Sequence, residues 1–121
     1  MILVDTGLWI DHIAAPLPAL SALLAEEQVV AHTLVTAEVS LGSLAQRLRV
    51  ISRLLRLDQL RVATIAQTQQ LIDGEGLWGT GVGYVDANLL ASVLLTPGTL
   101  LMTGDKRLLK QAERLGVAFR P

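Results

Sequence analysis

Ile2-Leu3-Val4-Asp5 is a run of three apolar residues that ends at a carboxylate, and Leu100-Leu101-Met102-Thr103-Gly104-Asp105 repeats this arrangement near the other end of the chain. Continuous apolar runs are typical of strands that are buried on both faces of a parallel sheet. Similar short runs at residues 28–31, 60–63 and 117–119 are further candidate strands. The sequence therefore predicts a sheet whose strands are short and buried.

Two amphipathic helices are predicted between or after these strands. Residues 44–55 place Leu44, Leu48, Ile51 and Leu55 at helical spacing, and Arg49, Arg53 and Arg56 gather on the opposite face. Residues 106–115 show the same division between leucines and basic residues, and a glycine follows as a helix stop. Both helices are expected to bury their leucine faces.

Two other segments are helical in pattern but apolar nearly all round, at residues 36–45 and 85–95, so we expect them to lie deep. Residues 96–99, Thr-Pro-Gly-Thr, predict a turn. Strands that alternate with helices favour an α/β domain with a central, mainly parallel sheet.

The composition fits one domain. The chain has 121 residues, of which 51% are hydrophobic and 17% charged, which supplies a core and excludes a disordered tail protein. No apolar run approaches the roughly 18 to 20 residues that span a bilayer, so we expect a soluble protein with no membrane contact. The absence of cysteine is expected of a cytoplasmic protein, and it excludes thiolate metal sites.

The net charge of −1 conceals blocks of opposite sign. Residues 1–46 carry five acids and no lysine or arginine, whereas residues 47–61 carry five arginines and one acid. Residues 62–105 return to four acids and no base, and residues 106–121 carry five bases and one acid. This pattern allows an anionic pocket that is bordered by cationic helices.

Four acids occupy apolar surroundings: Asp5, Glu38, Asp86 and Asp105. Burying an unpaired carboxylate costs several kcal/mol, so each needs a cation, a basic partner or an open cleft. Carboxyl ends of parallel strands face the ligand crevice, which is where Asp5 and Asp105 are predicted. Together the four would form an all-oxygen site for Mg²⁺ or Mn²⁺. The alternative is that they cap helices or pair with distant arginines.

Other motifs are weaker. Residues 74–79 match G-x-G-x-x-G, but they follow a helical pattern instead of a strand, which argues against dinucleotide binding. Residues 79–83 predict a glycine-rich loop that leads into the segment of Asp86. We interpret the two histidines as surface or supporting groups rather than metal ligands, and the two tryptophans as core or protein-contact residues. These are His12, His32, Trp9 and Trp78.

Four segments become distinctive when the acids are considered with their neighbours. They are Val4-Asp5-Thr6-Gly7-Leu8-Trp9-Ile10-Asp11-His12, residues 32–42 around Glu38, Gly83-Tyr84-Val85-Asp86-Ala87-Asn88-Leu89-Leu90-Ala91, and Thr103-Gly104-Asp105-Lys106-Arg107-Leu108. In this order and spacing they resemble the PIN-domain ribonuclease toxins of the VapC type. The resemblance extends over almost the whole chain.

The resemblance implies a single PIN-like domain over residues 1–121, with three α/β/α layers around a mainly parallel sheet. It implies a Mg²⁺- or Mn²⁺-dependent endoribonuclease that hydrolyses RNA, acts as the toxin of a type II toxin–antitoxin pair, forms a homodimer and is neutralised by a cognate antitoxin. Its acidic quartet would be Asp5, Glu38, Asp86 and Asp105, as catalytic residues and metal ligands. Thr6 and Thr103 would support them through hydrogen bonds.

Basic residues are the candidates for RNA binding: Lys106, Arg107 and Lys110 first, and Arg49, Arg53 and Arg56 second. Two positions depart from the family pattern. Gly7 stands where Ser or Asn is common, and Asn88 stands where His is frequent and is expected to alter substrate contacts. The alternatives are a PIN-like module that binds RNA or a partner without cutting, and a nuclease directed at DNA or at a particular nucleic-acid structure.

Overall fold

Short strands alternate with helices along the chain, and the computed structural model describes all residues from 1 to 121. The elements are β1 (Ile2–Val4), α1 (Thr6–Ala14), α2 (Pro18–Ala25), β2 (Val29–Ala31), α3 (Thr33–Ser40), α4 (Arg47–Arg56), β3 (Asp58–Gln59), α5 (Ile65–Glu75), α6 (Tyr84–Leu94), β4 (Leu100–Met102) and α7 (Lys106–Arg114). The predicted alternation of strands and helices is confirmed.

The four strands form one sheet in the order β3-β2-β1-β4, and every neighbouring pair is parallel. β1 therefore lies between the strand that follows it along the chain and the last strand. Leu101 of β4 also forms a parallel bridge with Ala118, so the C-terminal segment adds to the far edge of the sheet. The expected strands at residues 2–4 and 100–102 are confirmed with their bounds unchanged.

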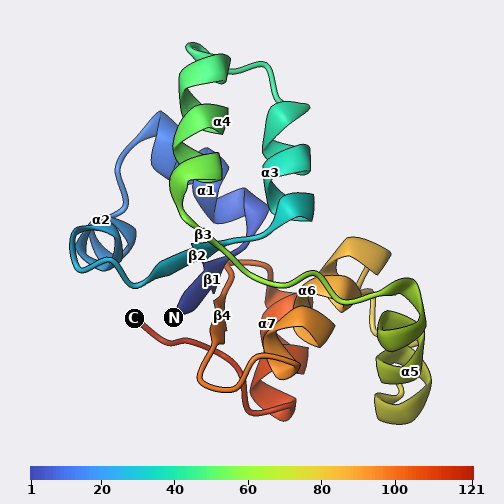
Figure 1. The fold of residues 1–121 in the computed structure, drawn as a ribbon. Coiled ribbons are helices and arrows are strands. Elements are labelled where there is room, and N and C mark those ends of the chain that lie inside the picture. The colour runs from blue at the N-terminus through green and yellow to red at the C-terminus, as the bar shows by residue number, and fades with distance from the viewer.

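Helices cover both faces of this sheet. In Figure 1, α1, α3 and α4 lie on one side of the strands, and α5, α6 and α7 lie on the other. α1 packs against α3 and α3 against α4, whereas α5 packs against α6 and α6 packs against β4. The predicted three-layer α/β/α arrangement is thus confirmed.

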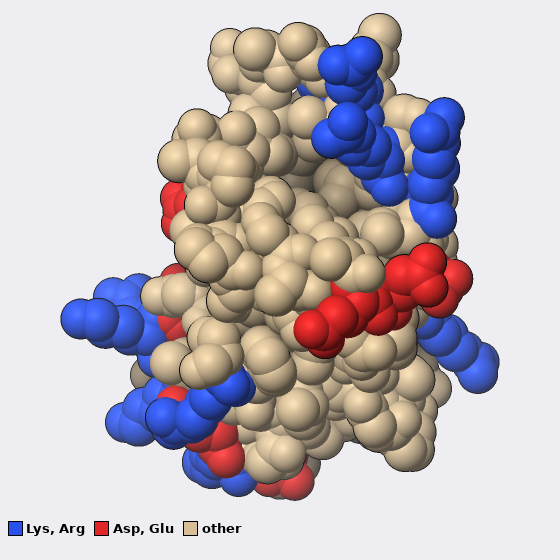
Figure 2. All heavy atoms as spheres, turned by 90° about the vertical axis from the view of Figure 1, so that its left-hand side faces the viewer, with Lys and Arg blue, Asp and Glu red and all other residues tan.

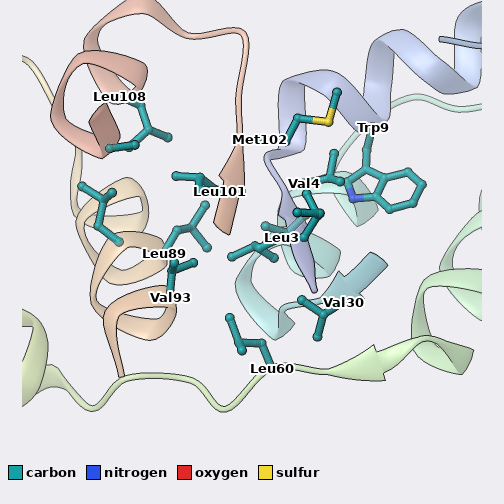
Figure 3. Packing of buried hydrophobic residues seen from close by; sticks show 14 of the residues in the cluster. Leu3, Val4, Trp9, Val30, Leu60, Leu89, Val93, Leu101, Met102 and Leu108 are labelled. Carbon is teal, nitrogen blue, oxygen red and sulfur yellow. The ribbon is translucent and has the colours of Figure 1, made fainter. Parts of the chain in front are cut away.

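The core fills the spaces between the layers. Leu3 of β1 and Leu101 of β4 are fully buried, and Figure 3 shows both beside Leu89 and Val93 of α6. Trp9 of α1 packs on the opposite face of the sheet and is 6% exposed, as expected of a core residue. α6 is apolar nearly all round, and each of its residues from 87 to 93 is buried, as predicted.

The prediction for the buried face of α4 was wrong. Leu48 and Leu55, which were expected to face the core, are 78% and 61% exposed, whereas Leu54 is buried. Because α4 joins the domain mainly by packing on the short helix α3, only a narrow face of it is covered. The leucines that were predicted to form the buried face of this helix therefore lie largely at the surface.

The predicted strand at residues 60–63 is shifted, since β3 comprises only Asp58 and Gln59. The backbone at Ala63 is satisfied by side chains of α6 instead of a neighbouring strand. The Ser92 hydroxyl accepts from the Ala63 N–H at 2.9 Å, and the Asn88 amide donates to the Ala63 carbonyl at 2.9 Å. The helix predicted over 36–45 is also shifted, because His32 accepts from the Leu34 N–H at 3.0 Å and caps α3.

Four buried polar side chains form a hydrogen-bonded group that we name the polar core: His32, Thr68, Asn88 and Ser92. The His32 ring and the Ser92 hydroxyl are 3.0 Å apart, and the Asn88 amide donates to the Thr68 hydroxyl at 2.9 Å. Burial lowers the pKa of His32. His32 was interpreted as a surface or a supporting group, and its burial excludes the first of these. Asn88, which was expected to alter substrate contacts, is also buried.

The other histidine and the second tryptophan differ in burial. His12 is half-buried and accepts a hydrogen bond from the Leu17 N–H at 2.9 Å. Trp78 is 70% exposed and so is not part of the core. No single helix is long and apolar enough to cross a membrane; α1 and α2 reach that length only as a pair bent by 100°.

Candidate active site

The site lies where β1 and β4 end side by side. These strands are neighbours although they are far apart in sequence, so the chain leaves the sheet in different directions on either side of this point. In open α/β sheets such a switch point forms the ligand crevice at the carboxyl ends of the strands. Asp5 follows β1 directly, and Asp105 follows β4 after two residues.

Two threonines connect the carboxylates of Asp5 and Glu38 and the backbone of Asp105 through hydrogen bonds. The Thr103 hydroxyl donates to Asp5 Oδ2 at 2.7 Å and accepts from the Asp105 N–H at 3.1 Å. The Thr6 hydroxyl donates to Glu38 Oε1 at 2.7 Å, and the Thr6 N–H donates to Asp5 Oδ1 at 2.7 Å. β1, α3 and β4 are thereby connected at one place.

Each of these acids is positioned by the start of a helix or by a helix face. Asp5 is the N-cap of α1 and Asp105 is the N-cap of α7, where its Oδ1 accepts from the N–H groups of Arg107 and Leu108 at 2.9 and 3.1 Å. Such capping is the alternative role considered for the acids, and for these two it is present. It uses Oδ1 of Asp105 and leaves Oδ2 without a hydrogen bond to the protein.

Asp86 completes the set from the first turn of α6. Burial, and after it the negative charges of Asp5, Asp105 and Glu38, raise the pKa of this carboxyl to about 6. Burial also raises the pKa of Asp5, against the lowering effect of the hydrogen bonds from Thr103 and Thr6. The four carboxylates predicted from sequence therefore lie near enough for their charges to contribute to the raised pKa of Asp5 and of Asp86.

No lysine or arginine neutralises these four acids. The ion pairs of the structure join Arg114 to Glu75 and Arg120 to Glu113, both away from the set. Pairing with distant arginines, the second part of the alternative, is therefore absent. Neighbouring carboxylates without a basic partner, which help to raise the pKa of Asp5 and of Asp86, are the electrostatic condition that a bound cation relieves.

The donor set fits a hard divalent cation, because it consists of carboxylate and hydroxyl oxygens without sulfur or imidazole. No three acidic or histidine side chains are close enough together to hold a single ion as they stand. The side chains present fit a cation by their chemistry and would have to close on it.

The basic candidates lie in two separate places. Lys106 and Arg107 begin α7 immediately after Asp105, with Lys110 about one turn later. Arg49 and Arg53 line a hollow beside the C-terminal end of α1, whereas Asp5 caps its N-terminal end. Figure 2 shows basic side chains gathered toward the top, over α4, and again toward the bottom. The two groups do not form one continuous stripe on this face.

The last arginine of the stripe lies farthest from the acids. Arg56 shares a hollow with Met1 and Val29, at the ends of β1 and β2 opposite the carboxylates. The structure thus brings Lys106 and Arg107 beside the acidic set and does not bring Arg56 there. RNA binding by these residues stays a prediction.

Comparison with known proteins places this geometry in a family. Residues 2–114 match the PIN domain. The chain is also 45% identical over 119 residues to "Ribonuclease VapC32" of two Mycobacterium tuberculosis strains, CDC 1551 / Oshkosh and H37Rv, covering 98% of this chain and 96% of each relative. The chain belongs to the VapC-type PIN-domain family. The resemblance stated from sequence is confirmed, and no solved structure matches the chain.

Proposed function

We propose that this VapC-type PIN-domain protein is an endoribonuclease that hydrolyses RNA phosphodiester bonds with Mg²⁺ or Mn²⁺. The observation that carries the proposal is the set of four carboxylates at the switch point of the sheet, none of which has a basic partner. Its 45% identical relative is named a ribonuclease, which supports RNA as the substrate. We further propose that it acts in the cytoplasm as the toxin of a toxin–antitoxin pair.

The carboxylates would share the work of holding the metal. Asp5, Asp86 and Glu38 are the proposed ligands, and Asp105 binds a second ion or acts through water. A divalent ion held by these residues would lower the pKa of the attacking water and neutralise charge on the phosphate. Thr103 and Thr6 orient the Asp5 and Glu38 carboxylates by donating to them. Asp86 must lose its proton to bind, so metal binding should weaken below about pH 6.

Exposed leucines support a protein partner. Leu48 and Leu55 line a hollow of about 440 Å³ between α3 and α4, and Leu48 is 78% exposed. Exposed apolar surface of this kind marks protein contacts. We propose that the chain forms a homodimer and is inhibited by a cognate antitoxin protein that occupies the active-site groove.

The decisive experiment compares cleavage of single-stranded RNA by the wild type and by Asp86→Asn. Asn keeps the size of the side chain and removes the charge, so we expect at least about a thousandfold loss of cleavage. Asp11→Asn is the matched control, since Asp11 is exposed on α1 and makes no side-chain hydrogen bond. Equal cleavage by wild type and Asp86→Asn would overturn the proposal.

One observation favours a second candidate function. The absence of three acids around a common point is what a PIN-like module that binds RNA or a partner without cutting would show. Calorimetric titration with Mn²⁺ separates the two, because the nuclease should bind the ion and Asp86→Asn should bind it more weakly. Parallel assays with single-stranded DNA identify a nuclease directed at DNA.

A further inference from the structure

Gly81 is the glycine of this chain whose missing side chain matters most. It lies in the loop before α6 with φ +86°, and a Cβ built there would be 2.6 Å from Cδ of Arg107. The same Cβ would be 3.1 Å from Nε and 3.2 Å from Nη1. Gly79 in the same loop has a φ of +72° but meets nothing within 4 Å. Gly81 therefore provides both a left-handed turn and the space in which an arginine side chain lies.

Arg107 lies on this space without a charged partner. It is exposed, it takes part in neither ion pair, and no hydrogen bond of its guanidinium to protein is formed. Its backbone N–H donates to Asp105 at 2.9 Å, which fixes its Cα beside that carboxylate. An exposed arginine ordinarily samples many rotamers, and ordering it costs conformational entropy. Contact with the Gly81 backbone restricts the rotamers of Arg107, while its guanidinium N–H groups remain available to donate hydrogen bonds.

The pair joins the two elements that carry half of the acidic set. Arg107 is in the first turn of α7, two residues after Asp105, and Gly81 is five residues before Asp86 of α6. In Figure 1, α7 and α6 lie next to each other on one face of the sheet. The Arg107 side chain therefore lies between the segments that carry Asp105 and Asp86, and it forms an ion pair with neither of them.

We propose that Arg107 binds the phosphate of the RNA substrate next to the cleaved bond and that Gly81 is the positioning residue that holds it there. The proposal rests on the proposed RNA-cleaving function and deepens it. A planar guanidinium can donate two parallel hydrogen bonds to a phosphate, which a lysine ammonium cannot. Among the three bases predicted to contact RNA from α7, the structure thus singles out the arginine.

The test measures kcat and KM for RNA cleavage in Arg107→Ala, Arg107→Lys and Gly81→Ala. Loss of a charge-assisted hydrogen bond should raise KM about tenfold in Arg107→Ala, and Arg107→Lys should recover only part of it. Arg120→Ala is the control for loss of one positive charge, since Arg120 pairs with Glu113 near the C-terminus. We expect its KM to stay within about twofold of the wild type.

The Gly81→Ala variant has its own matched control, Gly79→Ala. Gly81→Ala and Gly79→Ala both place a side chain at a positive φ, so both carry the same kind of backbone strain, but only the first displaces Arg107. Gly81→Ala should raise KM more than Gly79→Ala does, and adding it to Arg107→Ala should have little further effect because the two residues act together. Thermal unfolding of each variant confirms that it is folded.

RNA binding without cleavage separates failure of this inference from failure of the proposed function. In the Asp86→Asn background, Arg107→Ala should weaken the binding of a fluorescent single-stranded RNA. The slope of the logarithm of the binding constant against the logarithm of the salt concentration should become shallower by about one, as expected for the loss of one phosphate contact. Binding that weakens in this way without any cleavage by the wild type would end the proposed function and keep Arg107 as an RNA contact. An unchanged KM and binding in Arg107→Ala, equal effects of Gly81→Ala and Gly79→Ala, or no RNA binding by the wild type would each overturn the assignment.

Discussion

The helix α6 carries two polar regions that behave in opposite ways. Asp86 in its first turn has carboxylates and no basic partner near it, and burial together with the charges of those carboxylates raises its pKa to about 6. Asn88 and Ser92, further along the same helix, lie in the polar core and are hydrogen-bonded to Ala63, Thr68 and His32. Satisfied polar groups stabilise the fold that surrounds them, whereas an unsatisfied group of like charges destabilises it and leaves capacity for a ligand. Unfavourable electrostatics is thus the better sign of a candidate active site.

The largest effect on stability is expected from breaking the polar core. Asn88→Ala removes the donor to the Ala63 carbonyl and to the Thr68 hydroxyl, and leaves that carbonyl buried without this partner. We expect the free energy of unfolding to fall by about 3 kcal/mol, measured by urea titration. Gln69→Ala is the control, because the Gln69 amide donates only to Asp73 on the surface of α5.

Activity measured on the same Asn88→Ala variant tests the sequence-based expectation that Asn88 contacts substrate. Since Asn88 is 2% exposed, KM for RNA should stay within about threefold of the wild type under conditions where the variant is folded. A large rise in KM with unchanged stability would mean that the two regions are not separate.

The pH dependence of stability should have opposite signs in the two regions. The folded protein binds the Asp86 proton more tightly than the unfolded chain, whose ordinary pKa is 3.8. Its contribution to stability is therefore complete below about pH 4 and is lost as pH rises through about 6. Burial lowers the pKa of His32 from 6.5, so its contribution is present above pH 6.5 and is lost as pH falls.

A comparison of wild type with Asp86→Asn in the absence of metal isolates the contribution of Asp86 to the pH dependence of stability. The variant should be more stable at pH 7 by about 1 kcal/mol, a value reduced for the partial exposure of the side chain, and the difference should vanish near pH 4. Thermal unfolding at several pH values measures it. A variant that is less stable than the wild type at pH 7 would show that Asp86 is already neutralised.

The smallest effect is expected at Gly7, where the family pattern commonly has Ser or Asn. Gly7 is in the first turn of α1, exposed, and a Cβ there meets nothing within 4 Å. Gly7→Ser should raise the free energy of unfolding by no more than about 0.5 kcal/mol through helix propensity. Cleavage should change less than about threefold, and a larger change would place this position among the substrate contacts.

Much of the fold and of the site could be predicted from local pattern. Apolar runs ending at Asp5 and Asp105 predicted β1 and β4, and the all-round apolar character of residues 85–95 predicted a buried α6. The acids were recognisable because carboxylates are rare in apolar segments. Charge blocks were less informative, because α4 and α7 carry similar bases and only α7 begins beside the acids.

By itself the sequence determined the alternation of strands and helices, the identity of the four acids and membership of the family, since each depends on residue type and spacing along the chain. The tertiary structure alone decided that α4 exposes Leu48, that His32 is buried against Ser92, and that Arg107 lies over Gly81. These contacts join residues far apart in the chain, 60 positions for His32 and Ser92. Local periodicity carries no information on which distant surface will cover a helix or which polar group will meet another.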